Sequence, residues 1–235
     1  METLQNAIQN WYRAEHAKLA PMSPYQRLCY ILRYYRGWLA GTALLIAALC
    51  LIGNAAAQSR KQILLEGFFT NDEWNLFDAD VIQKDYGAVL SLKSDQRLVF
   101  DDGLYIDLGG QASDITSASN GKIVAYMAAG ELDFVVTTRP VLTHFEGQVP
   151  MKDLAGILPP ELLAQLEPYL IEGRDTDGNI IYEALDMTAS RYVAGVGADG
   201  DPAVTDTYYL FVPYNAPHTD QLAAYIRYCF PADGA

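Results

Sequence analysis

Six polar residues lie where an α/β fold usually binds its ligands. They flank one apolar helix and one apolar strand: Ser117, Ser119 and Asn120 precede the helix, and Thr137, Thr138 and Arg139 end the strand. Ligands of open α/β sheets gather at helix N-termini and beyond the carboxyl ends of strands. An arginine there can hold the carboxylate of a peptide or amino acid with two hydrogen bonds. The alternative is structural: Ser119 or Asn120 caps the helix, and Arg139 pairs with a surface acid.

A second group of oxygen-bearing side chains surrounds a predicted turn. Its members alternate at first and then spread out: Asp175, Asp177, Asn179, Glu183 and Asp186. Calcium loops use such alternation, but their sixth position needs glycine and here holds Ile180. Residues 180–185 alternate like a strand, so the pattern favours an ordinary hairpin turn at Asp177-Gly178-Asn179 over a metal site.

Motifs for cofactor binding and catalysis are weak. Residues 195–200 match the dinucleotide pattern G-x-G-x-x-G, but a strand is predicted to follow where a phosphate-binding turn needs a helix, so no cofactor is expected. The C-terminal region offers His144, His218 and a single cysteine, without G-x-S-x-G or H-E-x-x-H. We expect exposed histidines and no enzyme activity; an envelope hydrolase is the remaining catalytic alternative.

The charge of the chain is divided unevenly. Residues 1–36 carry five basic and two acidic side chains and are +3, whereas the whole chain is −13, which leaves −16 for the rest. A surface that acidic repels phosphate backbones, so nucleic acid is excluded as a partner of the C-terminal region, and cations or basic surfaces fit better.

An apolar segment follows the basic arm. Between Arg36 and Arg60 there are 23 consecutive uncharged residues, and about 20 such residues cross a bilayer as a helix. The predicted organisation is a cytoplasmic arm at 1–36, a transmembrane helix at 37–57 and an extracytoplasmic domain at 58–235, because basic residues favour the cytoplasmic side. Ala55-Ala56-Ala57 also resembles a signal-peptidase site, so a cleaved signal peptide is one alternative and a buried core helix another.

Local patterns predict an α/β domain after the apolar segment. Ser23-Pro24-Tyr25-Gln26 predicts a helix start before it, and Asn215 is expected to cap the last helix. Strands are expected at 62–69, 88–92, 97–108 and 132–138, with helices at 71–83, after Asn120 and after Pro160. Two hairpins are expected, at 170–172 with 180–185 and at 191–196 with 204–212. With only Cys229 in this region, no internal disulfide forms there.

Three stretches resemble the second half of extracellular solute-binding proteins of bacterial ABC importers. They are GKIVAYMAAGELDFVVTT at 121–138, DLAGILPPELL at 153–163 and FVPYNAPHTDQLAAYIRYCF at 211–230. The whole chain also looks like single-pass membrane proteins of Gram-positive gut bacteria. The resemblance implies a periplasmic-binding-protein-like type II α/β lobe with a mixed sheet, although residues 58–235 have room for one lobe where those proteins have two.

The expected function is therefore that of a membrane-anchored, extracytoplasmic binding or interaction protein without catalysis. Its expected partners are the membrane and either a small solute or an envelope protein. An envelope scaffold or assembly subunit without a small-molecule site is the main alternative.

Overall fold

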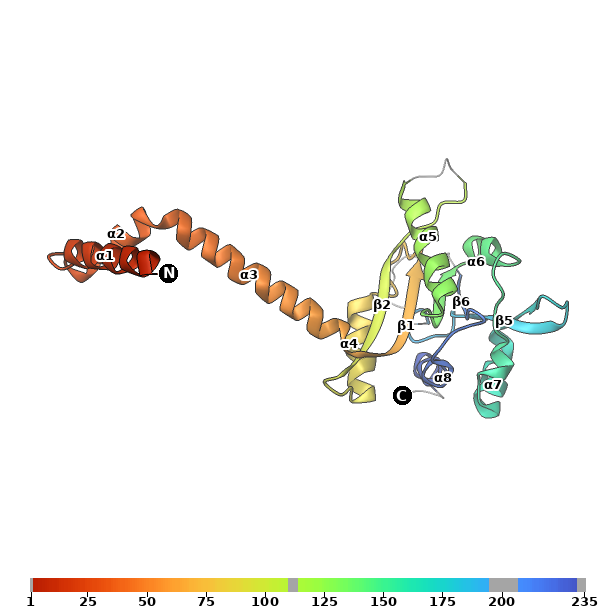
Figure 1. Ribbon diagram of the computed structural model, residues 1–235. Helices are drawn as coiled ribbons and strands as arrows, with labels where there is room; N and C mark the ends of the chain where they lie inside the picture. The colour runs from red at the N-terminus through yellow and green to blue at the C-terminus, as the bar shows by residue number, and fades with distance from the viewer. Residues whose placement is uncertain (1, 110–113, 195–206, 232–235) are drawn as a thin grey trace. The chain divides into compact units, whose positions relative to one another are not determined.

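The computed structural model describes residues 2–109, 114–194 and 207–231 of the chain (Figure 1). Two compact units are distinguished: a helical unit, Met1–Arg60, and an α/β unit, Lys61–Ala235. Each unit is described by itself.

The helical unit contains α1 (Glu2–Leu19), α2 (Pro24–Tyr34) and α3 (Arg36–Ser59). The predicted start of α2 is confirmed: the Ser23 backbone N–H donates to Gln26 Oε1 at 3.0 Å, and the Gln26 N–H donates to Ser23 Oγ at 3.3 Å. The Arg27 guanidinium donates to carbonyls at the end of α1, which satisfies acceptors that the helix itself leaves free.

One helix among the described residues is long and apolar enough to cross a membrane. Its 21-residue segment Arg36–Ala56 has no buried part, and large side chains such as Leu44 and Leu51 are exposed. A membrane anchor and a signal sequence share this length and composition.

The α/β unit is built on a six-stranded mixed sheet in the order β2-β1-β3-β6-β5-β4. The strands are β1 (Gln62–Thr70), β2 (Gln96–Leu104), β3 (Phe134–Thr138), β4 (Leu170–Arg174), β5 (Ile180–Asp186) and β6 (Tyr208–Phe211). β1 is parallel to β2 and β3, and the other neighbours are antiparallel. The expected α/β class with a mixed sheet is thereby confirmed.

Helices cover both faces of this sheet (Figure 1). On one face lie α4 (Ala79–Leu90), α7 (Pro160–Leu166) and α8 (Thr219–Cys229), which share a core with the buried side chains of Leu65 and Phe69. On the other lie α5 (Asp114–Ala129) and α6 (Arg139–Phe145), which pack with Phe68. Successive side chains of a strand point to opposite faces, so β1 contributes to both cores.

Two predicted elements near β1 are wrong. The helix expected at 71–83 is α4, which begins eight residues later, and the strand expected at 88–92 is the end of that helix. Side chains set the boundary: Asp72 Oδ2 accepts the Phe77 N–H at 2.6 Å, and Asp78 Oδ1 caps α4 by accepting the Val81 N–H at 2.9 Å. These local hydrogen bonds compete with helix formation before Ala79.

The second expected hairpin and the expected cap of the last helix also differ from the structure. A strand was expected at 191–196, but its described part, Arg191–Ala194, forms a turn in which the Val193 N–H donates to the Ser190 carbonyl. The turn expected at 199–201 lies outside the described residues. Asn215 does not cap α8; its Nδ2 donates to the Met127 carbonyl at 2.7 Å and so links the α8 approach to α5. The first hairpin, β4 with β5, is confirmed.

Candidate functional site

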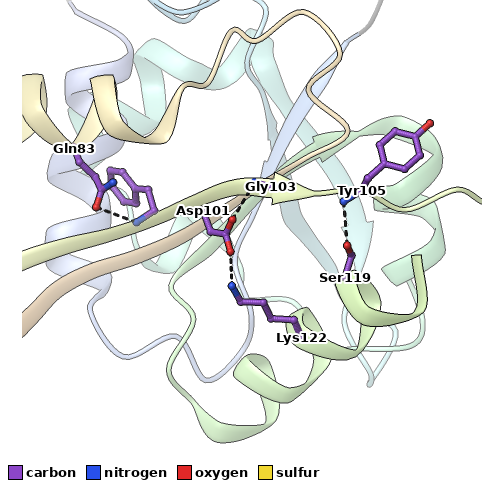
Figure 2. A network of polar contacts seen from close by, with 7 residues as sticks. Gln83, Asp101, Gly103, Tyr105, Ser119 and Lys122 are labelled. Atoms are coloured by element: carbon purple, nitrogen blue, oxygen red, sulfur yellow. Dashed lines mark hydrogen bonds and ion pairs between the residues drawn. The ribbon is translucent and has the colours of Figure 1, made fainter. Parts of the chain in front are cut away.

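Ser117, Ser119 and Asn120 lie inside α5, so the prediction that they precede a helix is wrong. α5 begins at Asp114, and its buried face docks on the chain after β2 (Figure 2). Ser119 Oγ accepts the Tyr105 N–H at 3.1 Å, and Thr116 Oγ1 accepts the Asp107 N–H at 3.1 Å. These bonds use Ser119 to join α5 to β2, while Ser117 remains exposed.

Lys122 continues the same contact between α5 and β2. Its ammonium pairs with Asp101 (Figure 2). It also lies 4.9 Å from the centre of the Phe68 ring. Asp101 Oδ1 also accepts the Gly103 N–H at 2.9 Å. The Asp101 carboxylate and the Phe68 ring thus hold the Lys122 ammonium in place. Lys122 and Asp101 are therefore already used in contacts between α5 and β2.

The three residues at the end of β3 have different surroundings and do not form one site. Thr137 is buried, with its Oγ1 2.6 Å from Thr70 Oγ1, and Thr138 immediately precedes α6. Arg139 opens α6, where its Nη2 lies 3.3 Å from Glu146 Oε1 and its guanidinium lies 5.6 Å from the Tyr209 ring centre. The structural alternative for Arg139, pairing with an acid, is therefore the observed arrangement.

Asp175, Asp177 and Asn179 form the turn of the β4–β5 hairpin. Asp175 Oδ1 accepts the Asp177 N–H at 2.9 Å and the Asn179 N–H at 2.8 Å. Hydrogen bonds from Asn179 are the main cause that lowers the pKa of Asp175. In residues 2–109, 114–194 and 207–231, no three His, Cys, Asp or Glu side chains gather as a metal site would require.

A cavity of about 920 Å³ lies beside this hairpin. Its charged lining comes from the chain after α6, the hairpin turn and β5: Glu146, Lys152, Asp153, Arg174, Asp175, Asp177 and Glu183. Apolar walls are added by Val149, Met151, Ile157 and Ile181. Small-molecule sites usually measure about 300 to 1,000 Å³ and combine apolar walls with a few polar groups, so the cavity has a suitable size and lining.

Two carboxyl groups meet in this cavity. Glu183 is 8% exposed, and Glu146 is the neighbouring charge that acts most strongly on it. Burial, and then the charge of Glu146, raise the pKa of Glu183 to about 7 against the opposing effect of Arg139. One guanidinium therefore serves two carboxylates, and the pair readily takes up a proton or another positive charge.

Local backbone geometry creates room for Glu183. The strand register pairs Tyr182 with Glu172 and Ala184 with Ile171, which leaves Glu183 as the extra residue of a β-bulge. Its carboxyl lies over Gly173 of β4, where any Cβ would collide with it. The bulge and the glycine together direct this side chain, and sequence inspection missed the Glu146–Glu183 pair because neither feature is a motif.

A separate polar cluster surrounds Asp133, which is fully buried just before β3. Its carboxylate accepts the Glu66 N–H at 2.7 Å and the His218 N–H at 2.8 Å, and it lies 3.0 Å from His218 Nδ1. His218 was expected exposed in the first turn of α8; it is the residue before that helix and is held by Asp133. Burial, then the charge of Glu131, raises the pKa of Glu66 to about 7.

His144 and the glycine-rich stretch complete the predicted candidates. His144 lies in the last turn of α6, half-buried, with its Nδ1 3.4 Å from Gln148 Nε2. Residues 195–200 lie outside the described residues.

Comparison of the chain with known protein families, characterised proteins and solved structures gives no match.

Replacing Glu183 with glutamine is expected to change how stability depends on pH. Because the folded pKa of Glu183 is raised from 4.5 to about 7, the native state holds a proton that the unfolded state loses, and wild-type stability falls as pH rises through this window. The variant lacks this loss and should be more stable at pH 8 by about 1 to 2 kcal/mol, after discounting the shift for solvent screening.

Urea unfolding of the full-length chain in detergent at pH 5 and pH 8 measures the effect. Glu66 titrates in the same window in both proteins, so the difference between them isolates Glu183. Glu172→Gln, on the exposed edge strand next to it, is the matched control and should follow the wild type. Parallel pH curves for wild type and Glu183→Gln would contradict the assigned burial effect.

Proposed function

We propose that this chain is a membrane-anchored binding protein that acts without catalysis. Its α/β unit lies outside the cytoplasm and holds a small solute in the cavity beside the β4–β5 hairpin. The observation that carries the proposal is the cavity of about 920 Å³, in which the buried carboxyl group of Glu183 lies between apolar walls beside the half-buried Glu146. Buried charges are retained rarely without a partner, so their presence in a cavity favours a ligand.

The proposed anchor is supported by α3 and by the charge of the segment before it. Arg36–Ala56 has the length and composition of a membrane span, and residues 1–36 are +3. Basic residues flanking a span are retained on the cytoplasmic side, which would place the acidic α/β unit on the outer side.

The proposed kind of lobe is supported by the resemblance to solute-binding proteins. The three resembling stretches correspond to the second half of α5 with β3, to the α7 region, and to the end of β6 with α8. They supply the middle of a mixed sheet and helices on both of its faces, which is compatible with a periplasmic-binding-protein-like lobe. An envelope scaffold that has no small-molecule site is the alternative outcome of the ligand test.

Protease added to intact cells tests the anchor and its orientation. A tag before Met1 should stay intact while the α/β unit is digested, and both should be lost once the membrane is permeabilised. The chain should also stay in the membrane fraction after an alkaline wash, because transferring about 20 apolar residues into water is too costly. A freely soluble full-length chain, or a protected α/β unit, would overturn this part of the proposal.

Thermal melting of the full-length chain in detergent tests the cavity. A ligand that binds only the folded state raises the melting temperature, by several degrees when it is present well above its Kd. Amino acids, peptides, sugars and amines form the panel. Gly156→Trp places a ring into the cavity from an open position and should abolish the rise, whereas Gly121→Trp, equally open but on α5, should preserve it. No response to any compound would favour the scaffold.

A further inference from the structure

The charges around the cavity leave one carboxyl group, that of Glu183, without a cation in ion-pair contact. Arg139 lies near Glu146, and Arg174 Nη1 donates to the Gly178 carbonyl at 2.8 Å. In the part of the chain that the structure describes, no Lys, Arg or His nitrogen lies within 4.0 Å of the Glu183 carboxyl oxygens. Glu183 is nevertheless 8% exposed and faces the cavity.

Two of the other acids of the cavity lining hold backbone groups, and a third, Asp177, is exposed in the hairpin turn. Asp153 Oδ1 accepts the Ala155 and Tyr182 N–H groups, each at 3.0 Å, and Asp175 holds the hairpin turn. These carboxylates stabilise backbone, and a carboxylate that already accepts such bonds gains less from a further partner. Glu183 has no such bond in the described residues, and a buried carboxylate without a cation is unfavourable until a positive charge reaches it.

The size and walls of the cavity select the kind of cation. A metal ion needs several oxygen or nitrogen ligands that converge at short distance, and the described residues contain no such group. A volume of about 920 Å³ fits a small organic molecule instead. Val149, Ile157 and Ile181 can cover its hydrocarbon part while Glu183 meets its charge.

We propose that the cavity binds an organic cation, a small molecule with a protonated amine at the end of a hydrocarbon chain, with Glu183 holding the ammonium group. This inference rests on the proposed binding function and adds the ligand class. Glu146 adds a second carboxyl group to the same part of the cavity and is paired with Arg139. The acidity of the region after the apolar segment adds long-range attraction for cations.

Proton linkage follows from the same groups. Glu146 and Arg139 are the charged groups that face Glu183, and burial raises the pKa of Glu183 to about 7. A bound ammonium favours the ionised carboxylate, so binding near neutral pH should release a proton and should be tighter at pH 8 than at pH 5.5.

Three compounds with the same five-carbon chain test the ligand class: diaminopentane, pentanediol and glutarate. Isothermal titration uses the full-length chain in detergent at pH 8. Diaminopentane should bind, and the neutral and anionic analogues should not. Glu183→Gln should weaken diaminopentane binding at least about tenfold, as expected for loss of a charge-assisted hydrogen bond, while Glu172→Gln should leave it unchanged. Gly173→Ala, which displaces the Glu183 carboxyl without removing it, should weaken binding as well.

Each outcome separates the two proposals. Binding of glutarate or pentanediol, or of another panel solute, without diaminopentane overturns the cation inference and leaves the binding function standing. Equal diaminopentane binding by wild type and Glu183→Gln also overturns the inference, because the amine then binds elsewhere. If neither diaminopentane nor any compound of the melting panel binds, both the inference and the binding function fail.

Discussion

Replacing Asp133 with alanine is expected to lower the free energy of unfolding of the α/β unit by about 3 to 5 kcal/mol. Asp133 is fully buried and accepts the backbone N–H groups of Glu66 and His218, and its Oδ2 lies 3.0 Å from the His218 ring. Alanine leaves those buried donors without an acceptor. It also removes the hydrogen bonds by which Asp133, just before β3, links the start of α8 to β1.

Urea unfolding of the full-length chain in detergent, followed by near-ultraviolet circular dichroism of the buried tyrosines, measures this loss. Asp85→Ala is the matched control, because Asp85 is exposed on α4 and the substitution should change stability by less than about 0.5 kcal/mol. Asp133→Asn keeps the shape and one acceptor oxygen and should fall between the two. A loss below about 1 kcal/mol for Asp133→Ala would show that water replaces the carboxylate.

Predictions from sequence succeeded where one periodicity ran without interruption. The alternation in 180–185 and the Asp177-Gly178-Asn179 turn gave the β4–β5 hairpin. A last helix was expected after Asn215 and is α8, in which the apolar side chains of Leu222, Ile226 and Cys229 are buried. In both cases the local pattern and the buried face agree, so tertiary contacts do not need to overrule local preference.

The missed elements were determined by long-range contacts. The first turns of α5 contain Ser, Thr, Asn and Gly, which have weak helix propensity and favour loops. That helix forms nevertheless, because Thr116 and Ser119 accept backbone N–H groups that follow β2. A donor 14 residues away in sequence, at Tyr105, is not visible in a local window.

The candidate site was the least accessible to sequence reasoning. Glu146 follows α6 and Glu183 lies in β5, and they meet because of a bulge and of the space over Gly173. Glu183 was considered only as an oxygen donor of a calcium loop, and Arg139 as a ligand-binding residue or as the partner of an unspecified surface acid. The one available signal was an acidic residue within an otherwise apolar strand, Ile180–Asp186, since a carboxylate at a buried position needs a reason.

Gly67→Ala is expected to destabilise the α/β unit by about 3 kcal/mol, near the upper end of overpacking costs. Gly67 lies in the central strand β1, and a Cβ there collides with the ring of Phe134. That ring cannot move aside freely, because it stacks on Tyr225 at 5.0 Å and meets Phe69 and Phe100 edge-on at 5.9 and 5.7 Å between ring centres.

Gly121→Ala is the informative control, because it changes the same residue type in open space on α5 and should stabilise the chain by about 0.5 to 1 kcal/mol through lower unfolded-state entropy. Urea unfolding therefore should give opposite signs for two identical substitutions. Adding Phe134→Leu should cost less in the Gly67→Ala protein than in the wild type, because the smaller side chain relieves the collision. Additive costs would mean that β1 shifts away from the ring, and that the close approach of Gly67 to Phe134 does not determine how this face of the sheet packs.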